Sequence, residues 1–247
     1  SWNSAFGDQS LYSNTTGSEN SAFGYYSLFA NTTGYANSAF GKKSLANNTI
    51  GNDNSAFGYR ALEDNTTGGA NVAIGVFSGA NSTTANYNTF VGYGSGSSNT
   101  TSSGLTAVGS FALFANTTGL SNAAFGSDAL LNNTTGGRNS AMGILSMRNN
   151  TTGNENIAAG YASLLLNSTG SQNSVFGNGA LYDNITGNSN TALGYKAGYK
   201  STGSSNIFIG YRAGYNETGD GKLYISNDEN SNLITGDFST GDINLGK

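Results

Sequence analysis

A short phrase recurs along this chain at a fixed interval. Residues 20–24 read NSAFG, and residues 37–41 read NSAFG again, seventeen residues later. Steps of seventeen residues from Asn3 reach an Asn in every unit except one, which begins at Leu105, and a single sixteen-residue step leads to the last unit at Asn206. A period with almost no insertions or deletions marks a repeat architecture and outranks any local reading of secondary structure. The sequence therefore predicts thirteen stacked units.

The fifth position of every unit is glycine. Each of these glycines precedes a pair of residues that differs from unit to unit, such as Asp8-Gln9 and Tyr25-Tyr26. A constant glycine beside variable residues is typical of a corner that requires a positive φ or a close approach of two backbones. We therefore expect structural corners at Gly7, Gly24, Gly41, Gly58, Gly75, Gly92, Gly109, Gly126, Gly143, Gly160, Gly177, Gly194 and Gly210.

The length of the unit limits what it can form. Seventeen residues are too few for two helices or for a strand, a helix and their loops, but they suffice for two short strands and two turns. The absence of Pro fits a backbone whose N–H groups are needed as ladder donors. The sequence predicts an all-β protein, a parallel β-solenoid (β-roll) with two short strands in each 17-residue coil and about 13 coils. A strand–helix repeat, suggested by segments such as 59–68, remains the alternative, although the recurring Thr and Gly disfavour helix interiors.

Two apolar columns follow from stacking the coils in register. Position nine is mostly Leu or Met, position eight is always Ser or Ala, and position four is bulky and apolar in every unit except at Ala159. Neighbouring coils bury apolar side chains that a single coil leaves exposed. The coil is too thin for both columns to be expected to point inward. One of the two columns should therefore form an apolar stripe on the outside of the rod. The position-four ladder comprises Phe6, Phe23, Phe40, Phe57, Ile74, Val91, Val108, Phe125, Met142, Phe176, Leu193 and Ile209.

An apolar stripe of that size is an association surface. We therefore expect a homotrimer, intertwined or side by side, in which three chains bring their stripes to a common axis.

Composition excludes several classes of function. Charged residues make up 10% and the net charge is −4, so the electrostatic footprint of a nucleic-acid-binding protein is missing. No stretch of ~20 apolar residues predicts a membrane span. Cys and His are absent, which excludes the usual zinc sites and Cys-His or Ser-His-Asp catalysis. We predict no enzyme activity, no metal and no cofactor.

Several motifs have a second interpretation. Asn-Thr-Thr, first at residues 14–16, matches a glycosylation sequon, but its fixed place in the repeat favours a ladder of stacked amides. The same phrase yields one outward Thr rank per coil, which leaves ice binding as an alternative function. Residues 227–230 (NDEN) suggest calcium but fit no EF-hand loop and favour a polar turn. Glu63-Asp64 suggests glycoside hydrolysis but occurs in one unit only and favours a solvated bulge.

The repeat phrase resembles sequences of known families. The run Asn-Ser-Ala-Phe-Gly-x-x-Ser/Ala-Leu resembles the head repeats of trimeric autotransporter adhesins, which build parallel β-rolls as homotrimers from somewhat shorter units. Residues 190–227 are similar to the C-terminal end of arrays in tail-fibre-like surface proteins of bacteria and phages. Residues 233–247 resemble the stretch that precedes an endosialidase-type intramolecular chaperone there. The resemblance covers the whole chain and implies architecture rather than a ligand.

The end of the repeat predicts a second segment. Residues 1–219 form the expected solenoid, and residues 220–247 the expected C-terminal cap and trimer junction. Within the latter, residues 222–226 and 232–238 alternate as strands do. An unpaired terminal strand edge requires such a cap.

These observations predict an extracellular fibre module at a cell surface or on a virion. It would be a rigid trimeric rod that presents or forms a receptor- or surface-binding face, with itself as partner and a surface receptor or glycan as ligand. The alternatives are an ice- or mineral-binding solenoid and a glycan-degrading tail spike. Exposed Tyr with Arg or Lys is typical of adhesive surfaces. The candidate surface comprises Tyr25, Tyr26, Tyr59, Arg60, Tyr93, Tyr161, Tyr195, Tyr211 and Arg212.

Overall fold

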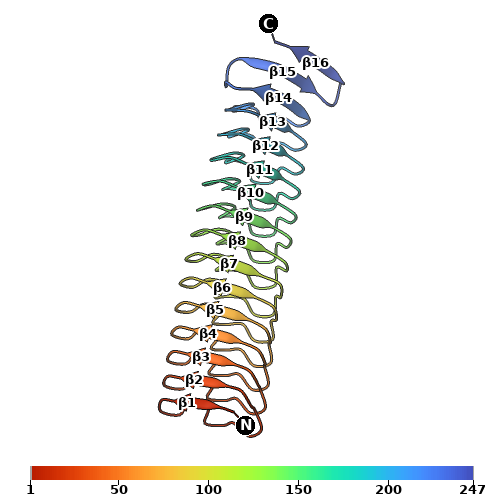
Figure 1. The fold of residues 1–247 in the computed structure, drawn as a ribbon. Helices are drawn as coiled ribbons and strands as arrows, with labels where there is room; N and C mark the ends of the chain where they lie inside the picture. The colour runs from red at the N-terminus through yellow and green to blue at the C-terminus, as the bar shows by residue number, and fades with distance from the viewer. Residues whose placement is uncertain (1, 247) are drawn as a thin grey trace. The chain divides into compact units, whose positions relative to one another are not determined.

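The computed structural model of the chain describes residues 2–246 and divides into two compact units, Ser1–Ala123 and Ala124–Lys247. The fold is an all-β, parallel β-solenoid of about 13 turns built from the 17-residue repeats (Figure 1). Residues 2–246 contain no helix, so none long and apolar enough to cross a membrane occurs among them.

In the first unit each repeat contributes one three-residue strand. Neighbouring strands pair in parallel and in register, so that Ser4, Ala5 and Phe6 lie beside Ser21, Ala22 and Phe23. The strands are β1 (Ser4–Phe6), β2 (Ser21–Phe23), β3 (Ser38–Phe40), β4 (Ser55–Phe57), β5 (Val72–Ile74), β6 (Thr89–Val91) and β7 (Thr106–Val108).

The second unit continues the same pattern and then changes it. Its repeat strands are β8 (Ala123–Phe125), which begins at the unit boundary, β9 (Ser140–Met142), β10 (Ile157–Ala159), β11 (Ser174–Phe176), β12 (Thr191–Leu193) and β13 (Ile207–Ile209). From β9 to β13 the pairing is again parallel and in register. β14 (Lys222–Ser226) adds one more parallel strand, and β15 (Asn232–Asp237) and β16 (Asp242–Leu245) follow as antiparallel hairpins. Strands thus lie where the alternation at 222–226 and 232–238 predicted them.

The expectation of two strands per coil is wrong. Positions eight to fourteen form turns, because residues at positions seven and nine adopt left-handed backbone angles: φ is 59° at Tyr26 and 50° at Leu28. Alternate left-handed residues prevent the extended conformation of a strand. The segment still bonds to the next coil, since Leu28 N–H donates to Ser44 O at 3.1 Å and Ala30 N–H to Ala46 O at 2.9 Å.

The core consists mainly of positions three, eight and nine. Successive strand residues point to opposite faces, so Ala22 faces inward while its neighbours Ser21 and Phe23 face outward. The left-handed residue at position nine also points inward. Its side chain is 0% exposed in Leu28, Leu45, Leu62, Leu113, Leu130, Met147, Leu164 and Leu181.

Two coils fill the core differently. Position three is Phe instead of Ala at Phe90, and the ring occupies the space of two position-nine side chains. Those positions are Gly79 and Gly96, where an added Cβ would lie 2.6 Å and 2.2 Å from the ring of Phe90. Phe208 stands in the same way between Gly198 and Gly214, at 2.5 Å and 2.2 Å. The four glycines that interrupt the Leu column are therefore compensations for two buried Phe rings.

Two asparagine ladders hold neighbouring coils together. At position one, Asn37 donates from its backbone N–H to Oδ1 of Asn20 at 3.0 Å and from Nδ2 to Gly51 O at 2.8 Å. At position twelve, Asn31 Nδ2 donates to Oδ1 of Asn14 at 2.9 Å and to Gly34 O at 3.0 Å. Asn31 is fully buried. The Asn of Asn-Thr-Thr thus serves as the amide ladder that its place in the repeat predicted.

Candidate binding surfaces

The corner glycines need both properties that glycine offers. All thirteen have positive φ, between 115° and 144°, where a side chain is strained. They also touch the next coil: a Cβ on Gly24 would lie 2.7 Å from the carbonyl carbon and oxygen of Gly41. The corner separates the outward strand residues from the variable positions six and seven.

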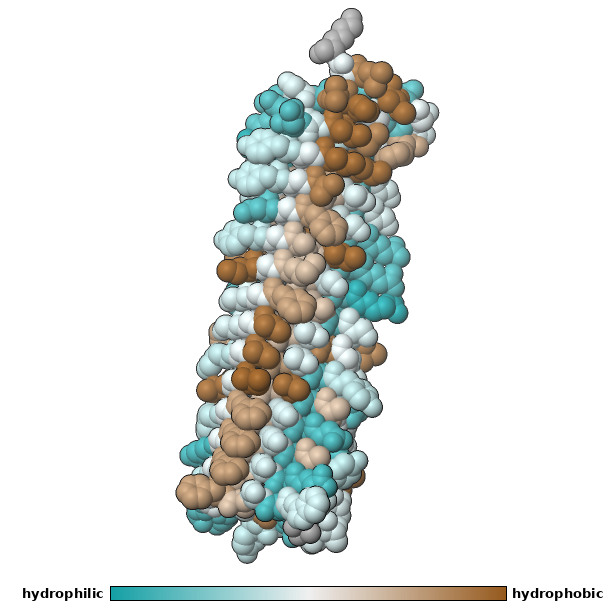
Figure 2. Space-filling view, viewed as in Figure 1, coloured by the Kyte–Doolittle hydropathy of each residue, from teal (hydrophilic) through white to brown (hydrophobic). Residues whose placement is uncertain are grey.

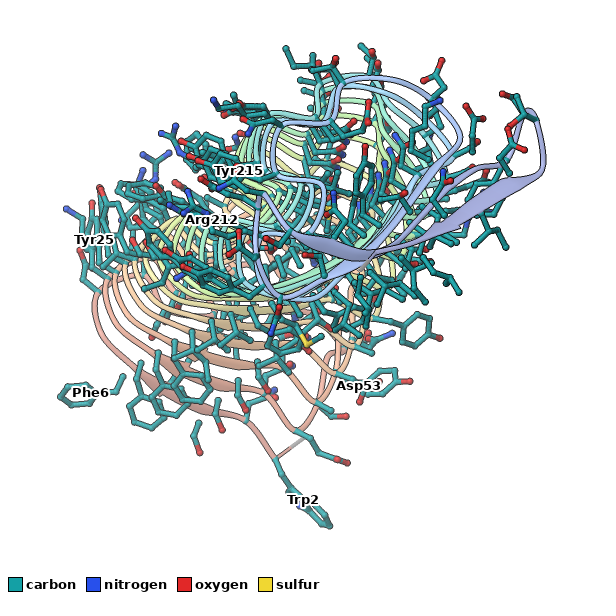
Figure 3. The ribbon with its side chains drawn as sticks, turned by 90° about the horizontal axis from the view of Figure 1, so that it is seen from above. Trp2, Phe6, Tyr25, Asp53, Arg212 and Tyr215 are labelled. Carbon is teal, nitrogen blue, oxygen red and sulfur yellow. The ribbon has the colours of Figure 1, made fainter. Side chains whose placement is uncertain are left out.

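The position-four ladder faces outward. Nine of its members are 36% to 75% exposed, and Phe40, Val91 and Val108 are half-buried. Rings in successive coils stack, with centroids 4.8 Å apart for Phe23 and Phe40 and 4.9 Å for Phe40 and Phe57. Figure 2 shows this ladder in each unit as a line of apolar side chains, and in Figure 3 Phe6 points away from the coil. Each unit therefore carries an uncovered apolar stripe.

The stripe of the second unit extends into the C-terminal hairpins. Register places Ile209 beside Ile225, Ile225 beside Ile234, and Ile234 beside Leu245. An apolar hollow of about 610 Å³ lies here, lined among others by Ile209, Ile225 and Leu233. Apolar side chains also gather over β13 to β16 in Figure 2. The hairpins thus add to the apolar surface of this unit.

The predicted tyrosine surface lies on the other side of the corner. At position six, six side chains are exposed: Tyr25, Tyr59, Tyr93, Tyr161, Tyr195 and Tyr211. The other three predicted members, Tyr26, Arg60 and Arg212, occupy position seven and are half-buried. Within each unit, these residues therefore form two adjacent columns, one at position six and one at position seven.

In the first unit two cations of this surface are paired with one carboxylate. Glu63, at position ten, forms ion pairs with Arg60 and with Lys43, the latter at 3.3 Å. Lys42 lies between two rings, 5.6 Å from the centroid of Tyr25 and 6.0 Å from that of Tyr59. The hydrogen bond to Glu63 raises the pKa of Arg60 above its usual value.

The interpretation of Glu63-Asp64 as a solvated bulge is therefore wrong for Glu63. Its side chain is buried beneath Lys43 and Arg60, because two cations compensate the desolvation of one carboxylate. The sequence prediction considered only the segment around Glu63. It did not include Lys43, which lies one coil earlier.

Position ten was missed by sequence reasoning. In the second unit it carries Tyr182, Tyr199 and Tyr215, whose rings stack with centroids 4.9 Å and 5.1 Å apart. Burial, together with the neighbouring Tyr182 and Asp183, raises the pKa of Tyr199. The signal was present in the sequence, since position ten is aromatic in six units: Tyr12, Phe29, Phe114, Tyr182, Tyr199 and Tyr215.

The C-terminal hairpin region holds its own polar contacts. The hydroxyl of Tyr224 donates to Glu217 at 2.6 Å, and burial followed by this bond raises the pKa of Tyr224 to about 12. Burial opposes ionisation of Glu217, but hydrogen bonds from Tyr224 and from two backbone N–H groups outweigh it and lower its pKa. Lys222 and Asp237 pair between β14 and β15, which lowers the pKa of Asp237 and raises that of Lys222.

The remaining motifs show turn chemistry. In the NDEN segment, Asn230 N–H donates to Asp228 Oδ1 at 2.8 Å, as in an Asx turn. No cluster of three metal-binding side chains occurs among residues 2–246. In the Asn-Thr-Thr phrase, Thr32 is half-buried and bonds to Thr49 O at 3.0 Å, whereas Thr33 is exposed. One exposed Thr rank is present in most coils, and it is interrupted at Ile50.

No protein-family model, curated protein or solved structure matches this chain.

Proposed function

We propose that this chain is a structural and adhesive fibre module that assembles as a homotrimer. The observation that supports the proposal is the exposed apolar stripe at position four, present in every coil except the one with Ala159. Soluble monomers rarely expose contiguous apolar patches larger than a few hundred Å². Three chains with their stripes on a common axis would remove this surface from water.

The shape of the stripe favours association between copies of the same chain. The exposed rings of Phe23 and Phe57 flank Phe40 at the spacing of the coils, so a second copy would present side chains at the same interval. A closed homo-oligomer uses such repetition because the same residues recur on each partner. The stacked apolar ladder therefore suits a partner with an identical period.

The position-six and position-seven columns are the proposed adhesive face. They lie on the other side of the glycine corner from the stripe, so they stay accessible when the stripe is covered. The resemblance to adhesin heads and tail fibres supports an extracellular site of action, at a cell surface or on a virion. In this proposal the chain performs no catalysis.

The mass of the particle tests the proposal. Native mass spectrometry of the full chain should give three times the 25.2 kDa of one chain. The double variant Phe40→Glu, Phe57→Glu should be a monomer with an unchanged far-UV spectrum, because both side chains face outward. Tyr35→Glu is the matched control, since Tyr35 is an aromatic residue at least as exposed as Phe57 but lies off the stripe; this variant should remain trimeric. A wild-type monomer with an intact β spectrum would overturn the proposal.

A further inference from the structure

The second unit carries two parallel rows of tyrosine beside each other. Position six supplies Tyr195 and Tyr211, whose centroids are 5.4 Å apart, and position ten supplies Tyr182, Tyr199 and Tyr215. Lys196, at position seven, lies between the rows, with its Nζ 5.3 Å from the ring of Tyr195 and 5.1 Å from that of Tyr199. We call these five tyrosines, with Lys196 and Lys200, the tyrosine–lysine ladder.

The lysines of the ladder form no ion pair with an acidic residue in the described range 2–246. Lys200 lies 5.5 Å from the ring of Tyr215, and no ion pair within residues 2–246 involves Lys196 or Lys200. Arg212 is different, because it pairs with Glu229 at 2.8 Å besides stacking on Tyr215 (Figure 3). Two ammonium groups thus remain available to an anion, in a chain whose net charge is −4.

The tyrosine rings offer their edges rather than their faces. The planes within each row are nearly parallel, at 16° for Tyr182 and Tyr199, 4° for Tyr199 and Tyr215, and 12° for Tyr195 and Tyr211. Each ring therefore covers the face of the next one. Binding of single-stranded nucleic acid relies on bases that stack on aromatic faces. Here the neighbouring rings cover those faces, so bases cannot stack on them. The rows present phenol hydroxyls at a repeat of one coil.

We infer that the tyrosine–lysine ladder binds a linear acidic polysaccharide along the coil axis. A row of hydroxyls at a constant interval fits a partner that repeats its own hydroxyl groups, and the two ammonium groups fit carboxylates or sulfates on it. Hydrogen bonds to charged groups are stronger than those between neutral groups. The lysines therefore provide most of the affinity, and the row of phenol hydroxyls aligns the polysaccharide with the coil axis. Asp183 is an opposing charge beside the rows and lies close enough to Tyr199 to raise its pKa, whereas Glu229, near Tyr215, is paired with Arg212.

This inference rests on the proposed function, since it names the ligand class of the adhesive face. The two are nevertheless separable. Oligomeric mass tests the trimer, and polysaccharide binding by the same samples tests the ladder. A trimer that does not bind overturns only the ladder, and a monomer that binds overturns only the trimer.

The experiment measures binding of the full chain to alginate, a linear polyuronate, by biolayer interferometry in physiological salt. Dextran serves as the neutral polysaccharide, and poly-L-glutamate and oligodeoxythymidine serve as other polyanions. We expect alginate to bind, dextran to bind at least about tenfold more weakly because it lacks the charge, and the other two to bind more weakly than alginate because they lack a row of sugar hydroxyls.

Variants locate the site. Lys196→Gln with Lys200→Gln should weaken alginate binding about tenfold or more, and Asp183→Asn should strengthen it. The triple change Tyr182→Phe, Tyr195→Phe, Tyr199→Phe retains the stacked rings and should weaken binding by removing hydroxyls only. Lys43→Gln is the matched control, because Lys43 is paired with Glu63 in the first unit; it should bind as the wild type does.

The inference is overturned if alginate does not bind, if the double lysine variant binds as well as Lys43→Gln, or if poly-L-glutamate or oligodeoxythymidine binds as tightly as alginate. Circular dichroism of every variant accompanies the measurement. The Tyr→Phe variant retains a hydrophobic ring at each position, so it remains informative if the lysine variant folds poorly.

Discussion

Positions four and nine of the repeat are both apolar columns, yet they have opposite environments. The side chains of Leu28 and Leu164 are 0% exposed, whereas those of Phe23 and Leu193 are 38% and 51% exposed. Similar residues thus build the core in one column and an association surface in the other. Residue type alone does not decide between these roles; the direction of the side chain does.

The direction follows from local backbone geometry. Position four comes after the inward position three on a strand, so it must point outward. Position nine has a left-handed backbone, with φ of 51° at Leu164, which turns its side chain into the coil. The glycine corner between them reverses the chain. Three features of the backbone therefore cause the difference in burial between positions four and nine: the strand, the glycine corner and the left-handed residue.

The largest effect is expected from breaking the corner. Gly126→Val should destabilise the fold by roughly 2–6 kcal/mol, because φ there is +132° and a Cβ would lie 2.6 Å from the carbonyl of Gly143. Thermal unfolding monitored by circular dichroism measures the loss. The control is Ser127→Val, since position six tolerates Val at Val76. Equal melting temperatures for wild type and Gly126→Val would contradict the assignment of this corner.

The exchange between Phe and Leu in the core offers a test with rescue. Phe90→Ala should cost about 3–5 kcal/mol, because it leaves a cavity between Gly79 and Gly96. Adding Gly79→Leu and Gly96→Leu recreates the ordinary coil and should restore most of the stability. Denaturant unfolding of the single, double and triple variants measures the coupling. A triple variant no more stable than Phe90→Ala alone would show that the glycines do not compensate for the ring.

The same substitution in both columns sharpens the comparison directly. Leu164→Ala removes a buried side chain and should cost about 2–5 kcal/mol. Leu193→Ala removes an exposed one from the same unit and should change the unfolding free energy of the monomer by less than about 1 kcal/mol, while weakening association. Urea unfolding in the Phe40→Glu, Phe57→Glu background measures both losses of stability, and native mass spectrometry of Leu193→Ala alone measures association. Equal losses would mean that the two columns are equally buried.

The smallest effect is the pH dependence of the C-terminal hairpins, where the polar contacts differ from those of the coils. Asp237 and Glu217 have lowered pKa values, so the stability they contribute is present above their ordinary pKa of about 4 and is lost as pH falls below it. Tyr224 has a raised pKa, so its contribution is complete below pH 10 and lost as pH rises through about 12.

Methyl NMR signals of Ile225 and Ile234, on neighbouring strands of the hairpin, should therefore shift at both extremes of pH, with no change between about pH 5 and 9. In Tyr224→Phe the alkaline shift should become smaller and the acidic one remain, because the Lys222–Asp237 pair is intact. Acidic shifts that already begin above about pH 5 would contradict the lowered pKa values of the two carboxylates.

Much of the architecture could be read from the repeat itself. The period determined the parallel, in-register stacking, and the constant Gly at position five indicated the corners, because few other residues tolerate their backbone angles or the contact with the next coil. The buried Asn ladder was predicted from the same regularity. In each of these features, identical residues at one position of the repeat contact each other in adjacent coils. The period of the sequence is therefore enough to predict the contact.

Other features were decided only by the tertiary structure. The sequence left open which apolar column faces inward, since Phe and Leu are equally suited to a core, and it led to a second strand where left-handed residues form turns. Glu63 is buried because Lys43 stands one coil away, and Gly79 and Gly96 are glycines because Phe90 reaches across both coils. Each of these features depends on the direction of a side chain or on a contact between different residue types in neighbouring coils. The period of the repeat predicts neither.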